Sequence, residues 1–142
     1  MACALLAWSS HFGDSVTSRP EAPASERLAA IFRRAARAFE REPRAHDTLL
    51  QVQASRDPHA GTAFAEFAAC QMASFEAAID DVPSADRGDI AMIMSAVLSE
   101  ALRGRQAGTC SQADVYARLD RAAELVTAGL DAGSTVTTMP VR

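Results

Sequence analysis

The segment from Ile90 to Leu98 most constrains the fold, because it is apolar on almost every side of a helix. Its residues read IAMIMSAVL, within a helix expected to run from Pro83–Ser84 to Gly104. A helix on the surface of a globular protein needs only one apolar stripe. This helix must therefore be covered on two sides, by its own core and by a second layer. The second layer is either internal to the chain or supplied by another chain.

The bulk composition indicates a single globular domain. The chain has 142 residues, enough to bury a core without disulfides or metal. No apolar run is long enough to cross a bilayer, and the start, MACALLAWSS, lacks the basic region of a signal peptide. We therefore expect a cytoplasmic protein that does not enter the membrane. The net charge of −4 argues against direct contact with nucleic acid, because such binding depends on neutralising phosphates.

The sequence predicts no catalytic, metal or cofactor site. Three cysteines without close pairing suggest neither a disulfide framework nor zinc. The histidines also lack metal-ligand spacing; they are His11, His46 and His59. His46 and Asp47 are adjacent, but neighbours on a helix do not face each other. Since no paired acid and base appears, an enzyme is disfavoured.

Helical patterning extends through the chain, and no segment alternates as a strand would. Ser25 is expected to cap one helix and Asp57-Pro58 to begin another. Ser111 with Asp114 is a variant of the capping box. The predicted fold is all-α, with about six helices covering roughly residues 4–12, 26–41, 45–54, 58–80, 84–104 and 112–131. Residues 1–132 form the predicted domain, in which 13–25 are a linker, and 133–142 are a disordered tail.

Large, deformable side chains gather on successive helices. They are Phe39, Phe64, Phe67, Met72, Phe75, Met92 and Met94. Such side chains line cavities for bulky apolar ligands, and they equally fill cores. Considered one by one, these residues are more typical of a core. Considered together, in a chain without catalytic groups, they make a ligand cavity more plausible. Five arginines between residues 33 and 44 either hold an anionic ligand group or form a solvated face, and the solvated face is favoured.

Three segments together resemble the C-terminal ligand-binding and dimerisation domain of TetR-type transcriptional repressors. They are RLAAIFRRAARAFEREPRAHDTLL, TAFAEFAACQMASFEAAI and ADRGDIAMIMSAVLSEALRGRQAG with ARLDRAAELVTAGL. The strongest parts are the helix end at Arg41-Glu42-Pro43 and the last helix pair, where Arg118-Leu119-Asp120 leads into Leu125-Val126. The nearest likeness is the KstR-like branch, which regulates steroid and cholesterol catabolism.

The resemblance implies a homodimer, built as a four-helix bundle from the last two helices of each subunit. The implied interface residues are Ile93, Val97, Leu98, Ala101, Leu119, Ala122 and Val126. This arrangement accounts for the two-sided apolar helix, since a twin subunit covers its outer side. A central helix buried within a monomer is the alternative. The resemblance also implies that the large side chains above bind a bulky apolar effector, steroid-like or acyl-thioester-like.

The N-terminal helix-turn-helix domain of the family is not recognised in this sequence. His11-Phe12-Gly13-Asp14 lacks the Lys and Leu that usually follow in the family, and Pro20 and Pro23 interrupt the expected connecting helix. Residues 1–12 are therefore interpreted as the remnant of that helix. The leading hypothesis is an effector-binding module without its own DNA reader, in a homodimer or a heterodimer with a full-length related regulator. The alternative is a helical scaffold or partner-binding protein with no ligand cavity.

Overall fold

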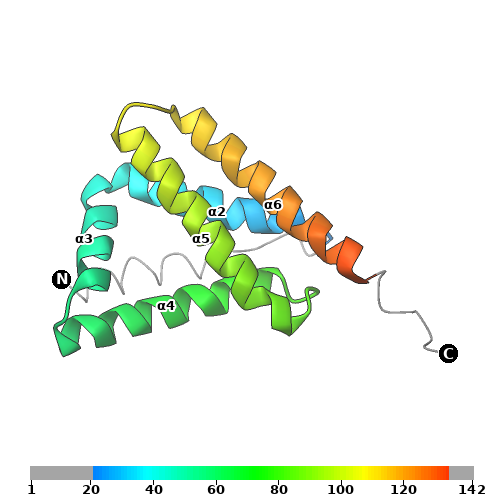
Figure 1. Cartoon of the computed structure of the whole chain (residues 1–142), viewed down its shortest axis with the longest axis horizontal. Coiled ribbons are helices and arrows are strands. Elements are labelled where there is room, and N and C mark those ends of the chain that lie inside the picture. The colour runs from blue at the N-terminus through cyan, green and yellow to red at the C-terminus, as the bar shows by residue number, and fades with distance from the viewer. Residues whose placement is uncertain (1–20, 135–142) are drawn as a thin grey trace.

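The computed structural model describes residues 21–134, except the side chains of residues 43, 63, 70, 74 and 131–134, and this part of the chain is all-α (Figure 1). Its five helices are α2 (Ala24–Arg41), α3 (Pro43–Ala54), α4 (Pro58–Ala78), α5 (Ser84–Gln106) and α6 (Gln112–Ser134). The predicted all-α fold is confirmed. The expected helix at 4–12, which includes the proposed remnant, lies outside the described residues.

Two helix starts follow the predicted local signals. At α4 the Asp57 carboxylate accepts a hydrogen bond from the backbone N–H of His59 at 2.9 Å, and Pro58 occupies the first turn. At α6 the backbone N–H of Ser111 donates to the Asp114 carboxylate at 2.7 Å, and the backbone N–H of Asp114 donates to Ser111 Oγ at 3.2 Å. This reciprocal pair is the predicted capping box.

The start of α2 and the end of α6 differ from prediction. The carbonyl of Pro23 accepts hydrogen bonds from the backbone N–H groups of Glu26 and Arg27, at 3.0 and 3.1 Å. The helix therefore begins at Ala24, ahead of the expected cap Ser25, and takes up the last two residues of the predicted linker. At the other end, α6 continues to Ser134, two residues into the predicted tail.

Helices α2, α5 and α6 pack against one another, and α4 packs against α2 and α5. In Figure 1, α5 and α6 run side by side in opposite directions, α2 lies behind them, and α3 connects α2 to the crossing helix α4. Gly108 has φ +73° in the turn between α5 and α6, a conformation that suits glycine. The side chains buried deepest in the core are Leu28, Ile79, Met94, Val115 and Leu119.

The arginine-rich side of α2 is only partly solvated. Arg33 pairs with Asp120 of α6 at 3.3 Å, and the Arg37 guanidinium lies 5.6 Å from the centre of the Tyr116 ring. The face predicted to be solvated is therefore partly covered, because α6 packs along that side of α2. Within residues 21–134, no helix combines the length and the apolar character needed to cross a bilayer.

The apolar helix α5 is covered on one side by its own protomer. Ile90, Met94 and Leu98 are buried there, with exposed fractions of 4%, 0% and 8%. The neighbouring Met92 and Ile93 remain 65% and 44% exposed. The internal core therefore accounts for one of the two apolar sides that the sequence shows.

Candidate ligand cavity

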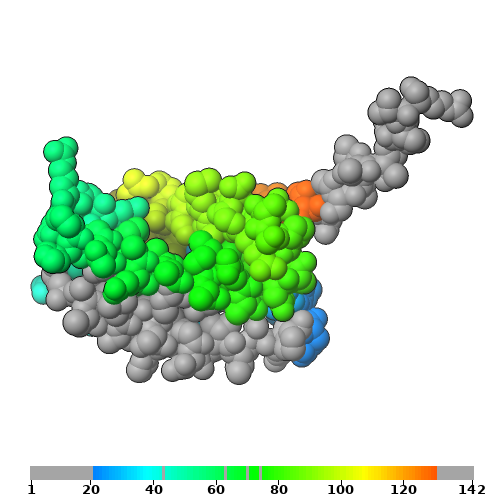
Figure 2. Space-filling view, turned by 90° about the horizontal axis from the view of Figure 1, so that it is seen from below, coloured from blue at the N-terminus to red at the C-terminus, as the bar shows by residue number. Residues whose placement is uncertain are grey.

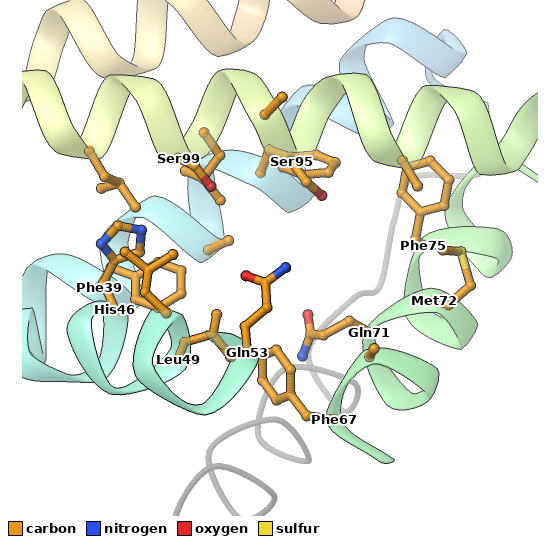
Figure 3. Close-up of a pocket in the computed structure, with 18 of the residues that line it drawn as sticks. Phe39, His46, Leu49, Gln53, Phe67, Gln71, Met72, Phe75, Ser95 and Ser99 are labelled. Carbon is orange, nitrogen blue, oxygen red and sulfur yellow. The ribbon is translucent and has the colours of Figure 1, made fainter. Parts of the chain in front are cut away.

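A cavity of about 450 Å³ lies between α2, α3, α4 and α5 (Figure 3). Its volume falls within the range of about 300–1,000 Å³ that is usual for small-molecule sites. Fifteen apolar residues line it: Ile31, Phe32, Ala35, Phe39, Leu49, Leu50, Phe64, Phe67, Ala68, Met72, Phe75, Ala91, Ala96, Leu98 and Leu102. Five polar residues complete the described lining: His46, Gln53, Gln71, Ser95 and Ser99.

Helical spacing brings these residues to the cavity. On α4, Phe64, Phe67, Gln71 and Phe75 recur every three or four positions and therefore share one face. On α5, the corresponding face carries small residues, among them Ala91, Ser95 and Ser99. Bulky side chains on α4 opposite small ones on α5 leave space between the helices. In the space-filling view from below, α4 and α5 run across the coloured part of the surface (Figure 2).

The structure brings together five of the seven side chains proposed from sequence to bind a ligand. The cavity is lined by Phe39, Phe64, Phe67, Met72 and Phe75, whereas Met92 and Met94 are not among its lining residues. Met94 is fully buried in the core and Met92 is 65% exposed. The two positions are corrected for different geometric reasons. Met94 lies on the side of α5 away from Ser95 and Ser99, whereas Met92, seven residues before Ser99, lies on their side but is exposed outside the described lining.

His46 is a cavity residue that sequence reasoning missed. Its side chain is 4% exposed, and its ring meets Phe39 edge to face, with 5.3 Å between ring centres. Neither ring nitrogen has a hydrogen-bond partner among the described residues. Burial lowers the pKa of His46; the Asp47 carboxylate opposes this shift and Arg103 adds to it. The imidazole is therefore held in its neutral form.

Further polar lining residues were missed as well. Gln71 lines the cavity with its Nε2 buried and without a partner. Ser95 and Ser99 are spaced by four within the apolar helix α5, a pattern that places both on one face. This serine pair is the local sequence pattern that could have indicated polar residues on the cavity wall. Among the described lining residues His46 is the only titratable one, and no Asp, Glu, Lys or Arg joins it.

The predicted dimer residues divide into two groups. Leu98, Ala101 and Leu119 are 8%, 1% and 0% exposed, so they belong to the protomer's own core and are corrected as interface residues. They lie in the buried core cluster that residues of α2, α5 and α6 form together. Ile93 is exposed. The three others are half-buried and pack against the rim of the core: Val97, Ala122 and Val126.

The described part of the chain is thus a helical bundle with a partly open, largely apolar cavity, and no Asp, Glu, Lys or Arg is among the described lining residues. Residues 22–126, more than half of the chain, match the family described as tetracyclin repressor-like, C-terminal domain, and the chain belongs to this family. Domains of this family are regulatory, commonly dimerise and bind small-molecule effectors. Neither a curated protein nor a solved structure matches the chain.

Proposed function

We propose that the domain senses a bulky, apolar effector, held in the cavity between α2 and α5, as part of a cytoplasmic TetR-type transcriptional regulator. One observation carries this proposal, the cavity of about 450 Å³ walled by Phe39, Phe67 and Phe75. Burying an apolar ligand there removes its surface from water, which is the main source of affinity in such sites.

The charges around the cavity favour an uncharged ligand body. The branch resemblance suggests either a steroid-like or an acyl-thioester-like effector. Arg33 and Arg37 contact Asp120 and Tyr116 of α6 and are absent from the cavity lining. A thioester would therefore place only its acyl chain inside, with its phosphates in solvent. A steroid-like ligand requires no such division and is the better fit.

We also propose that a second copy of this domain covers the outer sides of α5 and α6. Large apolar side chains exposed there are Met92, Ile93 and Leu125. Exposed apolar clusters of this kind mark association sites, and a stable interface buries on the order of 1,500 Å². The DNA-reading domain through which a regulator of this family acts is proposed to lie outside α2–α6. A heterodimer with a full-length related regulator, the alternative to a homodimer, would bring such a domain into the assembly.

The alternative function, a helical scaffold without a ligand, predicts a filled interior. The partly open cavity of about 450 Å³ leaves the space between α2, α3, α4 and α5 unfilled, which favours the effector-binding function.

Thermal unfolding with and without ligand tests the proposal. Steroids and acyl thioesters are added to the wild type, to Ser95→Phe and to Ala77→Phe. Ser95 faces the cavity, so its replacement fills the site, whereas Ala77 lies on the exposed side of α4 and serves as the control. We expect a ligand that raises the melting temperature of the wild type and Ala77→Phe but not of Ser95→Phe. If no compound of either class stabilises the wild type, the effector-binding proposal is rejected.

A further inference from the structure

Within the described part of the chain, two polar side chains in the cavity wall have buried atoms without hydrogen-bond partners. They are His46, through both Nδ1 and Nε2, and Gln71, through Nε2. Buried polar groups in folded proteins are nearly always hydrogen-bonded, because an unpaired one costs free energy. His46 is only 4% exposed, so its ring has little access to bulk solvent. Both residues line the cavity, so water or a bound molecule there can supply the missing partner.

The two groups lie at different places along the wall. Figure 3 shows His46 of α3 beside Phe39 at one end of the cavity. Gln71 of α4 extends its amide into the cavity from the opposite part of the wall, where Ser95 of α5 faces it. Most of the remaining lining is apolar, and its other polar residues are Gln53, Ser95 and Ser99. The cavity thus offers two separate hydrogen-bonding positions in a largely apolar space.

The chemistry of these positions selects against charge. A neutral imidazole donates through one nitrogen and accepts through the other, and the Gln71 amide nitrogen donates. A ligand carboxylate or phosphate enclosed here would lose its hydration without gaining a cationic partner, which is costly. A ketone, hydroxyl or ester oxygen pays a much smaller desolvation penalty and can accept from either group.

We propose, building on the effector-binding function above, that the cavity selects an uncharged apolar molecule with two separate oxygen functions, one hydrogen-bonded to His46 and the other to Gln71. The hydrocarbon body fills the aromatic part of the cavity. The two oxygens fix its orientation and distinguish it from hydrocarbons of the same shape. A charged molecule of similar shape is selected against, because no residue of opposite charge is among the described lining residues.

Competition with the neutral dye Nile red tests this selection. The competitors share a skeleton: androstenedione with two ketones, androstane with none, and an androstane carboxylate. A linear diketone and its parent alkane repeat the comparison without the steroid skeleton. The variants His46→Phe and Gln71→Leu each remove one hydrogen-bonding position while keeping the approximate shape.

Gln112→Leu is the matched control. The Gln112 amide on α6 is also buried without a partner, but it is not among the residues that line the cavity. Removing an unpaired polar group can stabilise the fold in all three variants, so a change in stability alone does not discriminate. We expect the preference for a diketone over its parent hydrocarbon to fall about three- to tenfold in His46→Phe and in Gln71→Leu, the worth of one hydrogen bond. Gln112→Leu should leave the preference unchanged.

The outcomes separate this inference from the function on which it rests. If the wild type does not bind Nile red, the effector cavity itself is rejected, and the inference with it. If the dye binds but neither diketone competes better than its parent hydrocarbon, only the inference is overturned. The same holds if the carboxylate competes best, or if both variants keep the wild-type preference. Circular dichroism checks folding, and His46→Gln and Gln71→Met replace any variant that does not fold.

Discussion

Arg27, in the first turns of α2, forms an ion pair with Asp81, which lies 54 positions later and just beyond the end of α4. Its guanidinium also donates to the carbonyl oxygen of Ala78 at 2.7 Å and to that of Ala22 at 2.6 Å. The last carbonyls of a helix lack partners within the helix. Arg27 supplies one at the end of α4 and so joins two of the helices that wall the cavity.

Removing this arginine is expected to destabilise the fold. Arg27 is 7% exposed, so Arg27→Met leaves the buried Ala78 carbonyl unpaired and should cost about 2–4 kcal/mol of unfolding free energy. The Asp81 side chain is 54% exposed, so Asp81→Asn should cost less than about 1 kcal/mol. Urea denaturation of the two variants measures both values. Equal losses would contradict the dominant role given to the Ala78 carbonyl.

The start of α6 offers a second, local test. Ser111 Oγ accepts from the backbone N–H of Asp114 at 3.2 Å and donates to the Asp114 carboxylate at 2.7 Å. Ser111→Ala removes both interactions and should cost about 1 kcal/mol, as is usual for an N-cap. Ser84→Ala is the control, because α5 begins without a side-chain cap. A loss of the same size in both variants would show that the capping box is not its source.

The elements of the fold were predictable where their signals are local. Asp57-Pro58 and the Ser111–Asp114 pair act within three positions of the chain, so their hydrogen bonds form in the same way wherever the helix packs. Ser25 failed as a cap because Pro23, two residues earlier, supplies its carbonyl to the first turn. When two neighbouring residues can each begin a helix, residue type alone does not tell which of them does.

The site was less predictable because side-chain direction on α5 depends on tertiary packing. The size of Met92 and Met94 predicts ligand contacts, yet the cavity lies against the small residues Ser95 and Ser99. The sequence around His46 predicts no functional role, because the adjacent Asp47 does not face it. Its importance arises from burial against Phe39 of α2, a contact between helices that no local pattern shows.

The exposed side of α5 predicts how association can be broken. Ile93→Glu places a charge on a side chain that is 44% exposed in the protomer and proposed to be covered in the dimer. Because buried unpaired charge is costly, the dissociation constant of the dimer should rise at least about tenfold. Light scattering coupled to size-exclusion chromatography measures this, with Ala77→Glu on α4 as the control. A wild type that is strictly monomeric at micromolar concentration would remove the proposed interface.

The buried imidazole of His46 makes stability depend on pH. Burial is the largest cause of its lowered pKa, relative to an ordinary value of 6.5; Asp47 on the same helix raises the pKa and Arg103 of α5 lowers it. The unfolded chain therefore binds a proton more readily than the folded one, so the stability gained from neutral His46 is present above pH 6.5 and is lost as the pH falls through the folded pKa.

His46→Phe keeps an aromatic ring beside Phe39 and cannot be protonated, so it isolates this contribution. Lowering the pH from about 7.5 to about 5 should reduce the unfolding free energy of the wild type more than that of His46→Phe, as linkage requires. His59→Phe is the control, because His59 is exposed on the first turn of α4. If wild type and His46→Phe lose stability in parallel on acidification, His46 is not held neutral in the folded state.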